Sequence, residues 1–183
     1  MKVYRKFQSK HQQGYTLIEL GIGIAIIAIL TAFIVGFSLS YYKKTRLNNE
    51  ARDMDFIQGE ITRHYSADPS TFPSMTDTVL ISFDLVPKSW RVTASTMKSP
   101  RYGAATFAPA TLHTTNDSVS MTINNVPTSD CKELVKARSE SYRQITVAGT
   151  VVKPDGGSVN DTTLATQCES AATVAMVWLW TRS

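Results

Sequence analysis

The sequence lacks the residue patterns on which common enzyme active sites depend. Its 183 residues contain no Gly-x-Ser-x-Gly, no phosphate-binding loop, no His-Glu-x-x-His and no Cys-x-x-Cys. Hydrolase, nucleotide-binding and zinc-enzyme chemistry therefore have no support at the level of motifs. His11, His64 and His113 are isolated from one another, which is typical of surface residues and not of a metal site, because a metal needs several ligands. We expect no catalytic residue, no metal and no cofactor.

Charge is missing from one long segment near the N-terminus. Between Tyr15 and Tyr42 the only charged residue is Glu19, and no proline occurs from Tyr15 to Ala67. The apolar residues continue to Phe37, close to the roughly 20 that span a bilayer as a helix. The run is too long for the apolar part of a secretory signal peptide, and no small-x-small cleavage site follows it. A charge in hydrocarbon costs roughly 2.5 to 3.5 kcal/mol, so Glu19 is a candidate functional residue.

The segment before the apolar run is basic and contains no acid. Four basic residues precede Gly14, namely Lys2, Arg5, Lys6 and Lys10. By the positive-inside rule they place the N-terminus in the cytoplasm and the C-terminal bulk on the other side of the membrane. An ordinary membrane anchor would explain this flank and the length of the run, but it would leave Glu19 without a purpose.

The run Gly14-Tyr15-Thr16-Leu17-Ile18-Glu19-Leu20, after a basic leader and before a charge-free helix, resembles the start of a type IV prepilin. The resemblance covers about residues 10–40. It implies that 1–14 is a leader cleaved after Gly14 by a prepilin peptidase, that Tyr15 is then N-methylated, and that Glu19 directs assembly. Tyr15 stands where the family most often has Phe, and the long leader and large C-terminal region favour the type IVb branch.

Removal of this leader would also remove the net charge of the chain. The full sequence has 19 Lys and Arg against 15 Asp and Glu, a formal charge of +4. The four basic leader residues account for the whole surplus, so we expect no general affinity for nucleic acid. Four basic residues of the C-terminal region form a weak candidate for a DNA-binding patch, which nearby Glu133 and Glu140 dilute: Lys132, Lys136, Arg138 and Arg143.

Residues 15–68 are predicted to form one long helix, with a membrane-spanning part at about 17–40. Small residues recur on one face of that part, at Gly21, Ala25, Ala28, Ala32 and Gly36, and such a face permits close packing between helices. Beyond Lys44 a mainly apolar stripe repeats every three to four positions, at Leu47, Ala51, Met54, Ile57 (or Gln58), Ile61 and Tyr65. This stripe predicts packing against the core of the same chain. Asp68-Pro69 is expected to end the helix.

Residues 69–183 are predicted to form a globular domain with an antiparallel sheet. Candidate strands cover 78–86, 118–124, 144–147, 150–152 and 173–180, with a hairpin at Ala148-Gly149 and a turn at 154–157. Asp130 and Glu133 match a capping box, so a second helix is expected over about 131–141. The predicted fold is α+β, a long N-terminal helix packed on an antiparallel β-sheet.

Cysteine is scarce, with only Cys131 and Cys168. In a domain outside the inner membrane such a pair predicts a disulfide that closes a loop of about 38 residues. Two buried thiols are the alternative. The arrangement resembles the C-terminal disulfide-bounded region of type IV pilins, which in that family frames the surface exposed along the fibre.

We therefore expect a structural subunit of a type IV pilus, made in the inner membrane and polymerised into an extracellular fibre for adhesion, aggregation, motility or conjugation. Its partners would be other pilin subunits, the prepilin peptidase, the pilus assembly machinery and a host or cell-surface receptor. The alternatives are a minor pilin, a tip adhesin or DNA-binding subunit, and a type II secretion pseudopilin. Pseudopilins generally depend on a calcium loop, for which the sequence shows no cluster of acidic ligands.

Overall fold

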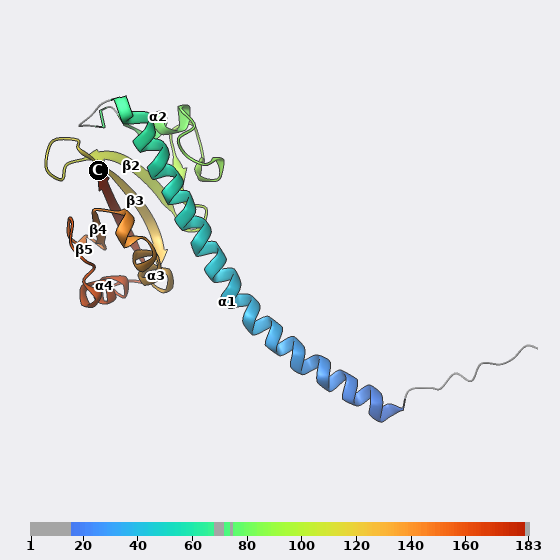
Figure 1. Ribbon diagram of the computed structural model, residues 1–183. Helices are drawn as coiled ribbons and strands as arrows, with labels where there is room; N and C mark the ends of the chain where they lie inside the picture. Colours follow the sequence, from blue (N-terminus) through green and yellow to red (C-terminus); the bar gives the residue numbers. More distant parts are fainter. Residues whose placement is uncertain (1–15, 68–71, 74, 182–183) are drawn as a thin grey trace, which may run out of the picture. The chain divides into compact units, whose positions relative to one another are not determined.

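The computed structural model describes residues 16–67, 72–73 and 75–181. The chain divides into two units, Met1–Lys43 and Lys44–Ser183, and each is described by itself. Helix α1, Leu17–His64, belongs to the first unit up to Lys43 and to the second unit from Lys44 onward (Figure 1). The predicted end of the helix at Asp68-Pro69 lies outside the described residues.

The described part of the first unit is helical from Leu17. Its residues Leu17–Ile34 form a helix long and apolar enough to cross a membrane, and none of them is buried. Eleven large apolar side chains along this part are more than half exposed, from Ile26 at 52% to Leu17 at 90%. Among the described residues of this unit, the helix therefore packs against no other element.

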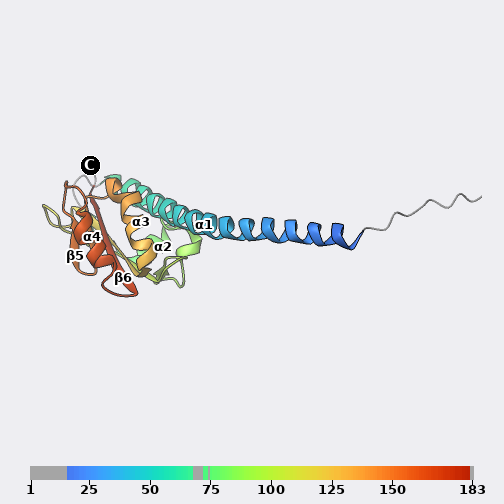
Figure 2. The same cartoon turned by 90° about the horizontal axis from the view of Figure 1, so that it is seen from below.

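The second unit combines the C-terminal half of α1 with a sheet and several short helices (Figures 1 and 2). After α1 the elements are η1 (Tyr65–Ala67), α2 (Asp77–Ser82), η2 (Lys88–Trp90), β1 (Met97–Lys98), β2 (Ala104–Ala110), β3 (Ser118–Pro127), α3 (Thr128–Arg138), η3 (Ser139–Ser141), β4 (Gln144–Val147), β5 (Thr150–Lys153), α4 (Asp161–Cys168) and β6 (Thr173–Thr181).

The six strands form one antiparallel sheet in the order β1-β2-β3-β6-β4-β5. The last strand, β6, lies in the middle, where Trp178 is paired with Met121 of β3 and with Ile145 of β4. The β4–β5 hairpin turns at Ala148-Gly149, whose φ angles are 48° and 80°, as two-residue hairpins of the tightest kind require. The predicted antiparallel sheet and this hairpin are confirmed.

The core lies between the C-terminal half of α1 and the inner face of the sheet (Figure 1). Tyr65 of the predicted stripe is partly buried and packs against the core. The other five members of the stripe are buried: Leu47, Ala51, Met54, Ile57 and Ile61. They meet alternate residues of the central strands, among them Met121 and Ile123 of β3 and Trp178 and Trp180 of β6. Alternate residues of a strand face one side of the sheet, so the period of each element brings its apolar side chains to a common interior.

Two sequence-based predictions in this domain are wrong. The expected strand at 78–86 is instead helix α2, because Thr76 accepts a hydrogen bond from the Val79 amide at its N-terminus (3.3 Å) and Asp84 (φ 57°) turns the chain after it. A short Val-Leu-Ile run fits either element, and the cap decides between them. The expected capping box at Asp130 is also absent: α3 begins at Thr128 without a side-chain cap, and Asp130 lies inside its first turn.

Candidate assembly site

The first turn of α1 presents Glu19 as an exposed carboxylate. Thr16 caps this turn, since its carbonyl oxygen accepts hydrogen bonds from the amides of Glu19 (3.0 Å) and Leu20 (3.1 Å). The Thr16 hydroxyl oxygen also accepts from the Glu19 amide, at 3.3 Å. A carboxylate at this position is favoured by the helix dipole. The pattern Thr-x-x-Glu is that of a capping box, a signal that was present in the sequence and that the motif analysis missed.

The two predicted processing residues, Gly14 and Tyr15, lie outside the described residues. Cleavage after Gly14 and methylation of Tyr15 therefore stay predictions, as does the role of Glu19 in assembly. Glu19 is the only charge on a helical surface that is apolar on all sides from Leu17 to Ile34. A helix of this kind needs lipid or other helices around it.

The small residues of this helix are exposed together with the large ones. Gly21, Ala25, Ala28 and Ala32 all lie on the surface of the unit, and a Cβ atom added to Gly21 would meet nothing within 4 Å. Among the described residues of this unit, these small side chains are not needed for close packing against another element. Close approach by another helix stays the prediction for this face.

Cys131 and Cys168 form a disulfide, as predicted, with their Cα atoms 5.7 Å apart. Cys131 lies in α3 and Cys168 at the end of α4, and both are fully buried. Helix α4 was not foreseen, although Asn160 caps it by accepting from the Thr163 amide at 3.0 Å. The bond joins α3 and α4 covalently.

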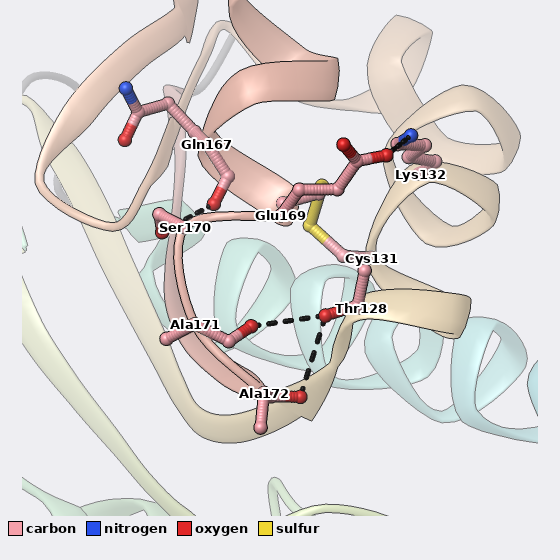
Figure 3. The surroundings of a disulfide bond; sticks show 9 residues. Thr128, Cys131, Lys132, Gln167, Glu169, Ser170, Ala171 and Ala172 are labelled. Carbon is pink, nitrogen blue, oxygen red and sulfur yellow. Dashed lines mark hydrogen bonds and ion pairs between the residues drawn. A yellow bond between two sulfur atoms is a disulfide. The ribbon is translucent and has the colours of Figure 1, made fainter.

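Polar contacts reinforce the junction beside the disulfide (Figure 3). The Thr128 hydroxyl donates to the carbonyl oxygens of Ala171 (3.0 Å) and Ala172 (3.4 Å). Lys132 forms an ion pair with Glu169 next to the bond. The start of α3 is thus held to the segment that follows α4.

The four basic residues considered as a DNA-binding patch each lie against a carboxylate. Lys132 faces Glu169, Lys136 faces Asp161 at 3.5 Å, Arg138 faces Asp55 at 2.8 Å and Arg143 faces Asp155 at 2.6 Å. In each pair the positive and negative charges largely cancel, so the electrostatic potential of the pair is weak a short distance away. This surface therefore lacks the excess of positive potential that attracts a phosphate backbone.

A buried charged cluster links α1 to the loop before β2 and to α3. Arg101 forms a paired contact with Asp130, with its Nη2 at 2.7 Å and its Nε at 2.9 Å from the same carboxylate oxygen. Glu50 of α1 is only 3% exposed, and its burial raises the pKa of the carboxyl group to about 7. The hydrogen bond with the Ser99 side chain and the charge of Arg101 act in the opposite direction and lower this pKa, but burial has the larger effect. Sequence analysis missed this cluster because its members are far apart in the chain.

His64 and His113 are exposed, but His113 is not isolated, and His11 lies outside the described residues. The Nε2 atom of His113 lies 2.9 Å from an oxygen of Asp155, which also accepts a hydrogen bond from Arg143. His64 lies at the end of α1 with its ring centroid 4.7 Å from that of Phe83. Within the described ranges, no three His, Cys, Asp or Glu side chains gather in a way that could hold a metal ion.

Two family models match the chain. Residues 9–35 match the prokaryotic N-terminal methylation motif, and residues 44–179 match the PilS N-terminal family. The second match covers most of the chain. The chain belongs to the PilS family of type IV pilins. No curated protein sequence matches this pilin.

Solved structures of type IV pilins share the fold of this pilin. The crystal structure of TcpA from Vibrio cholerae El Tor matches with a TM-score of 0.57 at 16% identity, covering 75% of this chain and 99% of that one. The crystal structure of the Salmonella typhi type IVb pilin matches with 0.57 at 20% identity, covering 72% and 97%. The NMR structure of PilS from Salmonella typhi matches with 0.52 at 19% identity, covering 74% and 96%. These likenesses show that the pilin has the predicted fold.

Proposed function

We propose that this pilin is made as an inner-membrane precursor, cleaved after Gly14 by a prepilin peptidase, N-methylated on Tyr15 and polymerised through α1 into an extracellular fibre. The observation that carries this proposal is the exposed apolar helix Leu17–Ile34 with Glu19 as its single charge. Such a surface is stable in a bilayer or between other helices, and a subunit that moves from one to the other uses both.

Glu19 acts in the proposed mechanism as the partner of a new amine. Cleavage after Gly14 creates a free α-amino group on Tyr15, four residues before the carboxylate. An unpaired carboxylate in a low-dielectric surrounding is strongly disfavoured, and a cation from a neighbouring subunit offsets that cost. Pairing between subunits would then set their axial register as the fibre grows.

In this proposal, successive segments of the chain have different roles. Residues 1–14 are the leader, 15–68 the helix with its spanning part at about 17–40, and 69–183 the domain on the fibre surface. The disulfide region of α3 and α4 supports this surface role, because a covalent bond between two surface helices preserves their contact outside the cell. The fibre would serve adhesion, aggregation, motility or conjugation through a receptor that binds this domain.

The test is co-expression of the full chain with a prepilin peptidase and the assembly machinery, read by mature mass and electron microscopy. We expect a product that starts at Tyr15, an added methyl group and visible fibres. Glu19→Ala should be cleaved normally but form no fibres, whereas Glu140→Ala, an exposed acid in η3, should form them. A product that starts at any other residue would contradict the processing step, and normal fibres from Glu19→Ala would contradict the assembly step.

A further inference from the structure

Two tyrosines mark the end of the apolar half of α1. Tyr41 is 72% exposed and Tyr42 is 66% exposed, and they are followed directly by Lys43 and Lys44. The first buried residue after them is Leu47. The aromatic pair therefore makes no part of the protein core, although each ring is large enough to contribute to one.

Tyrosine has an apolar ring and a polar hydroxyl, and it is enriched where hydrocarbon meets lipid headgroups. Lysine reaches from a helix toward the same layer with its ammonium group. We propose that Tyr41 and Tyr42, with the lysines that follow, form an interfacial collar that binds the phospholipid headgroups of the outer leaflet of the inner membrane. The collar holds the unassembled subunit at one depth; this inference rests on the membrane-bound precursor proposed above.

The spacing within α1 supports this placement. Tyr41 lies 22 residues after Glu19 in the same helix, a rise of about 33 Å at about 1.5 Å per residue. The hydrocarbon core of a bilayer is about 30 Å thick. With Tyr41 at the outer boundary, Glu19 reaches the inner boundary, where its carboxylate meets headgroups and water. The cleavage site, five residues earlier in the chain, then lies on the cytoplasmic side.

This placement explains how Glu19 is tolerated before any neighbouring subunit supplies a cation. The cost of a buried charge falls steeply from the centre of a bilayer toward its interfaces. A subunit that slid by one helical turn would move Glu19 by about 5 Å, either into the hydrocarbon or away from it. An anchor at the opposite end of the span prevents that movement.

Lipid is a better occupant of this collar than a second copy of the chain. The lysines complement the phosphates of anionic lipids, and the collar begins seven residues after Leu17–Ile34, a segment long and apolar enough to span a membrane. Burial of the rings between copies is the competing outcome in the experiment below.

The experiment places the full chain in vesicles of phosphatidylethanolamine and phosphatidylglycerol and labels it from outside with an impermeant maleimide. Single substitutions Ser38→Cys and Asn48→Cys report the positions just inside and just outside the collar. Cys131 and Cys168 are joined in a disulfide and do not react. We expect labelling at position 38 to be slower than at position 48 by about tenfold or more, because a thiol in hydrocarbon does not ionise.

The collar itself is tested with paired substitutions in the Ser38→Cys background. Tyr41→Ser with Tyr42→Ser should raise labelling at position 38 by about threefold or more, because the anchor is lost, and Tyr41→Trp with Tyr42→Trp should leave it unchanged. No change with the serine pair would overturn the collar. Protection that disappears when the protein is diluted in lipid would overturn it too, since a second copy would then be the occupant.

Flotation of the vesicles separates this failure from that of the proposed function. A chain that does not float with the lipid would contradict the membrane-bound precursor. The chain can instead float with the lipid and be equally protected at position 38 with tyrosine or serine at positions 41 and 42. That result would agree with the membrane-bound precursor and contradict only the collar.

Discussion

Arg101, whose side chain is 17% exposed, forms an ion pair with the buried Asp130, with Arg101 Nη2 at 2.7 Å from Asp130 Oδ2. Asp130 directly precedes the disulfide residue Cys131. The arginine comes from the loop before β2 and the aspartate from α3, so the pair joins the sheet to the helix that carries the disulfide. Glu50 of α1 lies close enough for Arg101 to lower its pKa. One guanidinium thus connects three parts of the fold.

Loss of one member of this pair should destabilise the fold strongly. Asp130→Leu leaves the Arg101 charge buried without its main partner, and we expect the free energy of unfolding to fall by about 3 kcal/mol. The double variant Arg101→Met with Asp130→Leu should recover most of the loss. Urea denaturation of the full chain in detergent micelles measures both. Lys132→Gln is the matched control, because its pair with Glu169 is exposed and should contribute under about 1 kcal/mol. A double variant as unstable as the single one would contradict this assignment.

Glu50 should make the fold less stable at high pH. Burial raises its folded-state pKa to about 7 from an unfolded value of 4.5, so the folded state binds the proton more tightly between these two values. Stability therefore falls as pH rises through this window, by about 3 kcal/mol above pH 7, and is not affected below pH 4.5. Glu50→Gln should be more stable than the parent at pH 8 and similar at pH 4.

The measurement for Glu50 is denaturant unfolding of the full chain at both pH values. Glu133→Gln, a change in an exposed residue of α3, is the control and should leave the pH dependence as it is in the parent. An equal pH dependence in Glu50→Gln and the parent would show that another group titrates in this window.

The disulfide should contribute several kilocalories to stability. Its half-cystines are 37 residues apart in the chain, and a loop of that length predicts a loss of about 4 kcal/mol when the bond is removed. Cys131→Ala with Cys168→Ala and reduction of the parent should both lower the denaturation midpoint. If the paired variant unfolds at the parental midpoint, the contacts of Thr128 and Lys132 hold the two helices without the bond.

Thr16 should hold the first turn of α1 around Glu19. Thr16→Val removes the hydroxyl that accepts from the Glu19 amide and should cost about 1 kcal/mol locally, which corresponds to amide exchange about fivefold faster at Glu19. Thr16→Ser keeps the acceptor and should exchange like the parent. Hydrogen exchange by NMR of the full chain in micelles distinguishes them, and equal rates in all three proteins would argue against the cap.

The hairpin turn offers a stabilising substitution. Ala148 has a φ of 48°, a left-handed conformation that costs an L-residue roughly 1 to 2 kcal/mol and that asparagine adopts more readily. Ala148→Asn should raise the free energy of unfolding by about 0.5 to 1 kcal/mol, whereas Ala148→Val, which is branched at Cβ, should lower it. The thermal midpoints of the two variants provide the test, and the opposite order would contradict it.

The elements that could be predicted are those whose signal is local. The long helix, its buried stripe from Leu47 to Ile61, the alternating strand at 118–124 and the hairpin at Ala148-Gly149 follow from periods and turn residues that are close together in the chain. The Glu19 motif belongs to the same class. Helix α2 was missed because a short apolar run fits two elements, and β2 because its alanines and Pro109 do not resemble a strand.

Local patterns were enough to predict a helix that is apolar on all sides and then on one side, with a single carboxylate at its start and two cysteines in the C-terminal region. The folded chain was needed to show that β6 lies in the centre of the sheet, that Arg101 contacts Asp130 and that Glu50 is buried. It was also needed to show that each of the four candidate DNA-binding cations faces an acid. The reason is physical: patterning depends on neighbours within a few residues, whereas ion pairs and burial depend on which distant segments the fold brings together.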